Sequence, residues 1–200
     1  MTERPTIKVD FSQYHGKRRW YVSLLLISLC LLVTPSSARE TSISDARTLL
    51  VEGVYRLGAH VEFDFNDTLR EALHNGVPLL MELRIEVLRE RAWLWSETVA
   101  ELSQRFELQY HALSRRYVVR NFSTGVQHSF RDMHEALGYI GIIYDLPLID
   151  ANLLKPRQKY TVRMRADIDV EALPTPVRLW AYLGSEWSLK SNWFQWPLKP

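Results

Sequence analysis

The sequence predicts a mainly β protein: an antiparallel β-sandwich, of immunoglobulin-like or related type, with two short helices and an apolar export segment before it. Apolar and polar residues alternate with a period of two along several segments, which is typical of strands with one buried face. No helical pattern is long enough to supply a core. The alternative is an eight-stranded barrel with an internal ligand cavity, because the sequence does not show whether the last strand closes on the first.

Residues 17–38 have the composition of an export signal. Lys17–Arg19 is basic, Trp20–Val33 is apolar, and Ser36 and Ala38 lie three and one positions before a cleavage site. As a helix the apolar run reaches about 21 Å, whereas a bilayer core of about 30 Å needs roughly 20 residues. These features favour cleavage over a permanent anchor.

The export segment divides the chain into two parts. We expect residues 1–38 to be a signal peptide and residues 39–200 to be a single β-sandwich domain in the periplasm. The alternative is an uncleaved N-terminal anchor that holds the domain at the inner membrane. The leader has five basic and two acidic side chains, so the domain is close to neutral and a nucleic-acid role loses its main support. The single cysteine, Cys30, also lies in the leader, which leaves the domain without thiol chemistry.

Three alternating segments predict the principal strands. Leu49–Phe65 has apolar residues at odd positions and predicts two strands hinged at Glu52-Gly53, and Val77–Val87 and Tyr160–Val170 repeat the alternation. Leu173–Pro176 is interpreted as a stiff connection between two later strands. Shorter strands are predicted at 105–112, 115–121, 125–129, 177–183 and 186–196.

Two short helices interrupt the strands. Asn66 is the predicted N-cap of the first helix, and Asn75-Gly76 ends it. Ser129 with Asp132 offers a capping arrangement for the second. The segment Trp93–Gln104 fits either a wide loop or a helical turn.

Two groups of metal-ligating residue types lie close together in the sequence. His60, Glu62 and Asp64 share the polar face of one strand, but side chains two residues apart on a strand are separated by about 6.6 Å and do not converge on one ion. The second group has neither of the usual helical metal spacings; it consists of His128, Asp132, His134 and Glu135. We expect exposed or capping roles for both groups, and no metal or cofactor.

No catalytic motif stands out in the chain. It has no Gly-x-Ser-x-Gly elbow and no Gly-rich phosphate loop. Asp167 and Asp169 lie on the exposed side of a strand that also carries Arg163 and Arg165, a pattern typical of ion pairs between neighbouring strands. We therefore predict that the protein is not an enzyme, and an unrecognised hydrolase is the least favoured alternative.

Tryptophan and arginine form the most suggestive surface. Six tryptophans lie in residues 39–200, and most are expected in the core because a domain without disulfides needs bulky apolar area. Trp193 and Trp196 are the expected exceptions. Since Trp, Tyr and Arg anchor protein interfaces, the candidate interaction surface consists of Arg115, Arg116, Tyr117, Trp187, Trp193 and Trp196.

Four motifs carry a resemblance to a known family. They are Asn75–Leu79 (NGVPL), Tyr110–Tyr117 (YHALSRRY), Leu146–Asp150 (LPLID) and Trp193–Leu198 (WFQWPL). In this order, over nearly all of the domain, they resemble the bacterial domain-of-unknown-function family 4390 of exported proteobacterial proteins. The family has no assigned catalytic residues. The resemblance implies a gene neighbourhood with a membrane sensor kinase and its response regulator, and hence a sensor histidine kinase as a partner.

The sequence thus predicts a non-enzymatic interaction or accessory module of the cell envelope that works through a protein partner. The alternative is a periplasmic β-domain that binds a small lipid or glycan. An apolar cavity between the sheets would favour the ligand, and an exposed Trp/Arg patch would favour the partner. A convergent cluster of histidine and carboxylates in a cleft would favour the enzyme.

Overall fold

A computed structural model describes residues 41–91, 95–183, 187 and 189–199 of the chain. Residues Arg39–Pro200 form one compact unit, and its buried apolar side chains run from Ile43 to Leu198, so the unit contains its own core. The predicted export segment, residues 1–38, lies outside the described residues. Within the described part, no helix is both long enough and apolar enough to cross a membrane.

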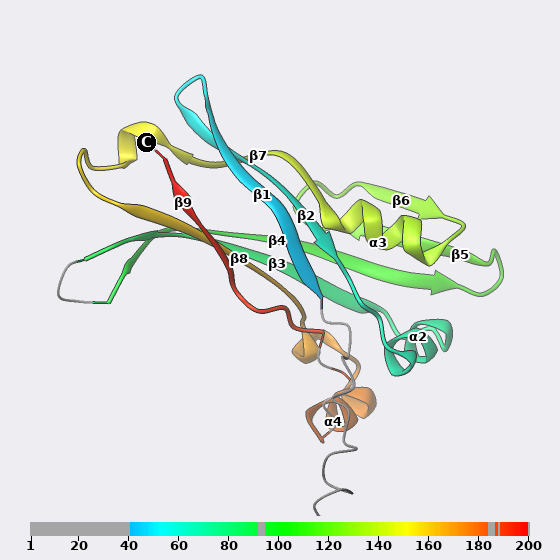
Figure 1. The fold of residues 1–200 in the computed structure, drawn as a ribbon. Coiled ribbons are helices and arrows are strands. Elements are labelled where there is room, and N and C mark those ends of the chain that lie inside the picture. The colour runs from blue at the N-terminus through cyan, green and yellow to red at the C-terminus, as the bar shows by residue number, and fades with distance from the viewer. Residues whose placement is uncertain (1–40, 92–94, 184–186, 188, 200) are drawn as a thin grey trace, which may run out of the picture. The chain divides into compact units, whose positions relative to one another are not determined.

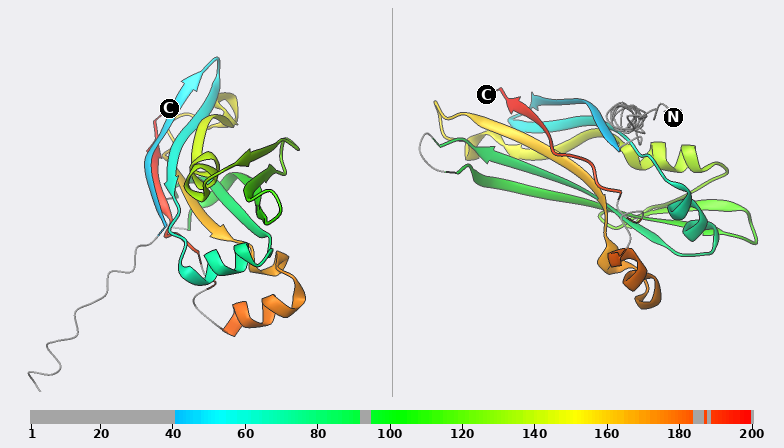
Figure 2. Two further views of the ribbon diagram at one scale, coloured as in Figure 1. Left: turned by 90° about the vertical axis from the view of Figure 1, so that its right-hand side faces the viewer. Right: turned by 60° about the horizontal axis from the view of Figure 1, so that its bottom comes forward.

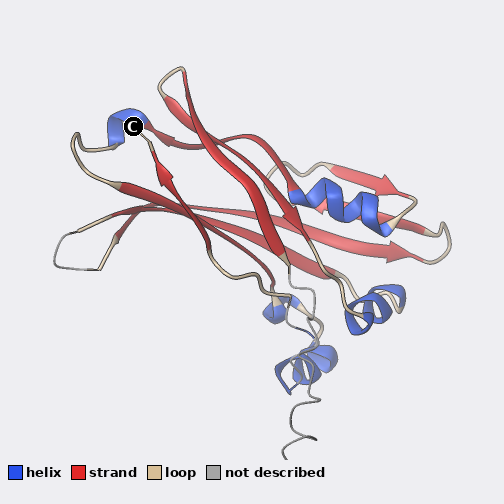
Figure 3. Ribbon diagram, in the orientation of Figure 1, coloured by secondary structure: helices blue, strands red, loops and turns tan. Residues whose placement is uncertain are grey.

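Two antiparallel sheets form this unit (Figures 1 and 3). The smaller has the strand order β1-β2-β7, with β1 at Ser42–Val51, β2 at Val54–Glu62 and β7 at Ile142–Asp150. The larger has the order β6-β5-β4-β3-β8-β9. Its strands are β3 (Leu79–Arg89), β4 (Glu97–His111), β5 (Arg116–Asn121), β6 (Gln127–Phe130), β8 (Tyr160–Ile168) and β9 (Phe194–Leu198).

Short helical elements connect the strands. In the described residues these are the α-helices α2 (Asp67–His74), α3 (Met133–Gly141) and α4 (Thr175–Leu183) and the 3-10 helices η2 (Ala151–Leu153) and η3 (Val170–Ala172). The two predicted helices are therefore confirmed as α2 and α3. The helix α4 is an addition that the sequence did not predict.

The core lies between the two sheets, which Figure 2 shows from two further sides. Tyr55, Leu57 and Val61 of β2 face it from the smaller sheet, and Leu83 of β3 and Met164 of β8 face it from the larger. The predicted alternation is thus confirmed over 55–65 in β2 and beyond it, over 77–87 in β3 and over 160–168 in β8. The predicted strand at 49–51 is the end of β1, but Leu49 and Val51, which were expected to face the core, are exposed. In β1 the strand begins earlier than predicted, at Ser42.

A hydrogen bond between two side chains joins the two sheets along one side. Trp196 Nε1 on β9 donates to Thr48 Oγ1 on β1 at 2.8 Å. Among the described residues, backbone pairing does not continue between these two strands, and β6 and β7 are further edges. The described strands therefore do not close into a barrel, which overturns the alternative fold.

The predicted strand at 177–183 is wrong, because Thr175–Leu183 is helix α4. Pro174 begins it: the backbone carbonyl of Pro174 accepts from the amides of Val177 and Arg178. A proline at a helix start costs little, because amides there have no helical partner. Leu173–Pro176 accordingly leads into a helix instead of joining two strands.

Two further boundaries differ from the prediction. The strand predicted at 105–112 begins at Glu97, so the described part of Trp93–Gln104 is mostly strand instead of a loop or helical turn. Pairing with the long β3 over Leu79–Arg89 extends β4 in this direction. The strand predicted at 186–196 begins only at Phe194, and β7 was not predicted.

None of the tryptophans whose burial is described is fully buried. Of the tryptophan side chains whose burial is described, Trp95 is 91% exposed, and Trp187, Trp193 and Trp196 are half-buried. The expectation of a core position is therefore wrong for Trp95, whereas Trp187 packs against the core, and Trp193 and Trp196 are the expected exceptions. The inward positions of the strands are instead filled by Leu, Ile, Val and Met, whose volumes fit between two sheets.

Each of the two predicted helices has a side-chain cap at its N-terminus. Asn66 caps α2, its side chain accepting from the Leu69 amide at 3.0 Å, as predicted. Asp132 caps α3 through the His134 amide at 2.6 Å, while Ser129 lies in β6 and takes no part. At its other end α3 packs so closely on β2 that a Cβ on Gly141 would lie 2.1 Å from the carbonyl oxygen of Val61.

Candidate interaction surfaces

A shallow groove runs along the outer face of the smaller sheet. We call it the sheet-face groove; its volume is about 180 Å³, and it is lined by Arg47, Leu49, Val51, Arg56, Leu57, Gly58, Tyr144 and Asp145. The register of the sheet explains this composition: Arg47 is paired with Gly58 and Leu49 with Arg56, and paired residues share a face. Because Gly58 has no side chain, the middle strand forms a low floor between β1 and β7.

The groove has apolar walls with charges between them. Leu49 is 59% exposed on β1, and Tyr144 is 86% exposed on β7. Between them, Arg56 binds Asp145 at 2.7 Å. Asp145 lies at an irregularity in the register of β7, with a φ of 52°, which turns its carboxylate toward the guanidinium.

This face is more apolar than a solvated sheet face. Outward positions of an antiparallel strand are ordinarily polar. Here Ile142, paired with His60 on the outer face, is 61% exposed, and it continues the apolar surface of Leu49 and Tyr144. Large apolar side chains exposed together on one face of a protein are typical of an interaction site, whereas single exposed apolar side chains are common on any surface.

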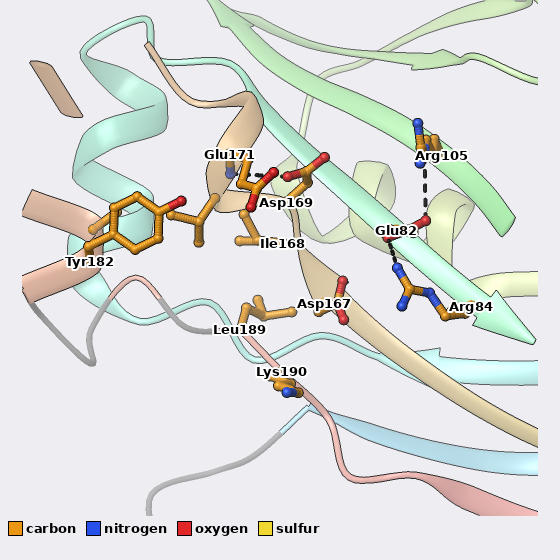
Figure 4. Close-up of a pocket in the computed structure, with 12 residues that line it drawn as sticks. Glu82, Arg84, Arg105, Asp167, Ile168, Asp169, Glu171, Tyr182, Leu189 and Lys190 are labelled. Atoms are coloured by element: carbon orange, nitrogen blue, oxygen red, sulfur yellow. Dashed lines mark hydrogen bonds and ion pairs between the residues drawn. The ribbon is translucent and has the colours of Figure 1, made fainter. Parts of the chain in front are cut away.

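A second hollow lies on the outer face of the larger sheet (Figure 4). This charged cleft has a volume of about 510 Å³. Its centre is Glu82, which accepts hydrogen bonds from Arg84 at 3.0 Å, from Arg105 at 3.4 Å and from Ser103. The other residues that line it are Asp167, Ile168, Asp169, Val170, Glu171, Ala181, Tyr182, Leu189 and Lys190.

The two central carboxylates of the charged cleft have opposite pKa shifts. Burial raises the pKa of Asp167, assisted by the negative charge of Glu82, its cross-strand partner, and only partly opposed by Arg165 at 3.1 Å. For Glu82, burial also acts to raise the pKa, but the hydrogen bond from Ser103 and the charge of Arg84 outweigh it, so the pKa is lowered. Such a split can serve acid–base chemistry, but both carboxylates here are held by cations.

Asp169, which the sequence grouped with Asp167, has a separate role. Its side chain accepts from the amides of Glu171 at 3.0 Å and Ala172 at 3.3 Å and so caps η3. The predicted cross-strand ion pairing is confirmed for Arg163 of β8 with Glu86 of β3 at 2.6 Å. Arg165 and Asp167 instead pair along β8, and both side chains are only partly exposed.

A third hollow, of about 400 Å³, lies between α2 and α4. We call it the helix groove. Its lining is mostly apolar: Ala72, Val77, Pro176, Val177 and Trp187, with Thr68, Glu71 and Asn75 at the edge.

The predicted interaction residues lie in three separate places. Arg116 of β5 donates to Ser129 Oγ at 2.8 Å, and Tyr117 beside it is hydrogen-bonded to His74 Nε2 at 2.7 Å. Burial raises the pKa of Tyr117. Arg115 is the exposed turn residue before them, with a φ of 51°.

The three predicted tryptophans are distributed differently. Trp193 stacks under the guanidinium groups of Arg163 and Arg165, at 4.3 and 4.7 Å from its ring centre. Trp196 joins β9 to β1, and Trp187 lines the helix groove. Since β4, β3 and β8 separate β5 from β9, the tryptophans and the Arg115–Tyr117 segment do not form one surface.

The sequence reasoning missed the sheet-face groove, although a signal for it exists. Leu49-Leu50-Val51 and Ile142-Ile143-Tyr144 are runs of three apolar residues at the ends of strands. In a strand, successive side chains point to opposite faces, so such a run places an apolar residue outside.

The described residues hold no group of three His, Cys, Asp or Glu side chains placed to share a metal ion. Neither His60, Glu62 and Asp64 nor the sequence group around His134 is arranged in that way. His128 instead stacks against Tyr139 with ring centres 4.7 Å apart.

Comparison with known proteins gives one match. The model of the family described as a domain of unknown function, DUF4390, matches residues 38–197. No curated protein and no solved structure matches the chain. Since the family match covers most of the sequence, as the four motifs indicated, the chain belongs to the DUF4390 family.

Proposed function

We propose that this chain is an exported protein of the cell envelope that acts without catalysis, by binding a partner protein through the sheet-face groove. Its accessory role is proposed to serve a membrane sensor histidine kinase, as the family's gene neighbourhood implies. The finer fold class is part of the proposal: a sandwich related to the immunoglobulin type, preceded by an export segment and located in the periplasm.

The observation that carries the proposal is the exposure of large apolar side chains on the smaller sheet. Tyr144, Ile142 and Leu49 are each more than half exposed. Aromatic and arginine residues supply much of the binding energy of protein interfaces, and Arg47 and Arg56 lie beside Tyr144 in the groove. A partner that covered these residues would bury apolar area and meet two guanidinium groups.

The charged cleft supports binding over catalysis. Glu82 is engaged by Ser103 and two arginines, and Asp167 is engaged by Arg165. A carboxylate that acts as a general acid or base must reach a substrate, and these carboxylates already have partners within the sheet.

The test compares two double variants in the native host by chemical crosslinking in cells and mass spectrometry of the purified, tagged chain. Leu49→Ser with Tyr144→Ser removes the apolar walls of the groove. The matched control is Leu113→Ser with Val126→Ser, which changes two exposed apolar residues outside the groove. We expect a recurrent envelope protein that the control retains and the groove variant loses. A set of adducts that is the same for both variants would contradict the proposal.

A second candidate function is the binding of a small apolar ligand, such as an acyl chain, in the helix groove. Its apolar lining and the half-buried Trp187 favour this alternative. Native mass spectrometry of the protein from its host tests it: a bound lipid that is lost in Val177→Asp supports this function, and an unliganded wild type contradicts it.

A further inference from the structure

Three connections lie at the end of the fold where β1, β3 and β7 finish. They are the β1–β2 turn, the connection between β7 and β8 that contains η2, and the β3–β4 hairpin. Two backbone hydrogen bonds tie them together: the Ala151 amide donates to the Gly53 carbonyl at 2.8 Å, and the Glu90 amide donates to the Lys159 carbonyl at 3.0 Å. In Figure 1 the β1–β2 turn lies at the top and the connection between β7 and β8 at the upper left, whereas the β4–β5 hairpin lies on the right.

Each of these connections exposes a large apolar side chain. Trp95 precedes β4 and is 91% exposed, Leu153 of η2 is 72% exposed, and Leu50 at the end of β1 is 53% exposed. Tryptophan and leucine at loop tips are the residue types that enter the interfacial region of a bilayer.

The same end carries unpaired positive charge. Lys155, Arg157 and Lys159 are exposed and form no ion pair with a described residue. No aspartate or glutamate occurs between residues 151 and 166.

The acidic side chains nearby are mostly engaged. Glu97 is bound by Arg89 and Arg91, Glu90 accepts from Thr161 at 2.9 Å, and the exposed Asp150 accepts from the Asn152 amide at 2.8 Å. Glu52 is exposed and places a negative charge on the β1–β2 turn. The attraction for anions therefore comes from the three basic side chains of the neighbouring β7–β8 connection.

We propose that these three connections form a docking surface for a membrane that contains anionic phospholipid. We call it the loop end, defined by Leu50, Trp95, Leu153, Lys155, Arg157 and Lys159. The apolar tips enter the headgroup region, and the basic side chains meet the lipid phosphates. Charge complementarity selects this occupant over a neutral surface, because a basic residue near an anionic bilayer adds about fivefold to the partition coefficient (about 1 kcal/mol). The surface is distinct from the sheet-face groove, so a membrane-bound protein keeps its groove free for a partner.

The test is co-sedimentation of residues 39–200, the unit that contains its own core, with phosphatidylcholine vesicles with and without phosphatidylglycerol. We expect binding only to the anionic vesicles, with loss on raising the salt concentration. Trp95→Ser with Leu153→Ser, and separately Lys155→Glu with Arg157→Glu, should each lower the partition coefficient by about tenfold or more.

Matched controls lie elsewhere on the same unit. Leu113→Ser changes a fully exposed leucine of the β4–β5 hairpin, and Arg120→Glu with Arg131→Glu reverses two exposed arginines. Both controls should bind as the wild type does, and circular dichroism should show all variants folded. The absence of wild-type binding to anionic vesicles, or an equal loss in control and loop-end variants, would overturn the inference. Either outcome leaves the proposed partner binding intact, because that is measured at the sheet-face groove.

Discussion

A single methyl group added to the last residue of α3 should disrupt the packing of that helix on β2. In Gly141→Ala, the new Cβ would lie 2.1 Å from the Val61 carbonyl oxygen, whereas ordinary contacts begin at 3.4 Å. Helix and strand must therefore separate by about 1.3 Å, and both belong to the packed core. Overpacking of this kind costs typically 1–3 kcal/mol and sometimes more, so we expect a loss of about 3 kcal/mol in the free energy of unfolding.

The same helix provides the matched control. A Cβ added at Gly138 would meet no neighbouring atom within 4 Å, so Gly138→Ala should stabilise the fold by about 0.5–1 kcal/mol through helix propensity. Urea unfolding of residues 39–200, followed by circular dichroism, measures both changes at constant m-value. Equal stabilities of the two variants, within about 0.5 kcal/mol, would refute the close approach of α3 to β2.

Three further predictions concern the caps, the link between the sheets and the charged cleft. Asp132→Ala should lower the free energy of unfolding by about 1 kcal/mol in urea titrations, because the His134 amide loses its acceptor, and an unchanged midpoint would show that the cap is dispensable. A double-mutant cycle of Trp196→Phe and Thr48→Val should give a coupling energy of about 1 kcal/mol for their hydrogen bond; additive effects would mean that β9 and β1 are not joined there. For Asp167, burial raises the pKa above 3.8, so the folded state holds the proton more tightly than the unfolded state does. Wild-type stability relative to Asp167→Asn should therefore fall as the pH rises from 3.8 through the folded-state pKa, as unfolding titrations at several pH values would show; a constant or rising difference would contradict the raised pKa.

Strands with one buried face were predictable because burial imposes a period of two on the sequence. In β3 and β8, nearly every inward position is apolar and most outward positions are charged, so their inner and outer faces could be told apart without the structure. The cap of α2 was equally local, since Asn66 and the Leu69 amide are three residues apart.

The misassigned elements depend on contacts that are distant in sequence. The first half of β4 is a strand because β3 pairs with it, and β7 is a strand because β2 does, with a bulge and a proline that break the alternation. In α4 the segment 177–183 is apolar enough to fit either period, and in the structure it continues a helix whose first backbone hydrogen bonds run to the Pro174 carbonyl.

The candidate surfaces likewise depend on contacts between residues that are distant in sequence. Arginine and tryptophan drew attention to Arg116 and Trp193, whose side chains are largely occupied by Ser129 and by two stacked arginines. The sheet-face groove depends on the pairing of three strands, and the loop end depends on two backbone bonds between distant connections. Neither pairing is visible in a single sequence.

The proposed function is tested most directly by photo-crosslinking from Tyr144 in living cells of the native host. A crosslinking amino acid replaces Tyr144, and a second strain carries it at Leu113 on the β4–β5 hairpin. We predict one recurrent envelope protein joined to position 144 and absent from position 113, with the periplasmic part of a sensor histidine kinase as the expected adduct. No protein adduct at position 144, or the same adducts at both positions, would contradict partner binding at the sheet-face groove.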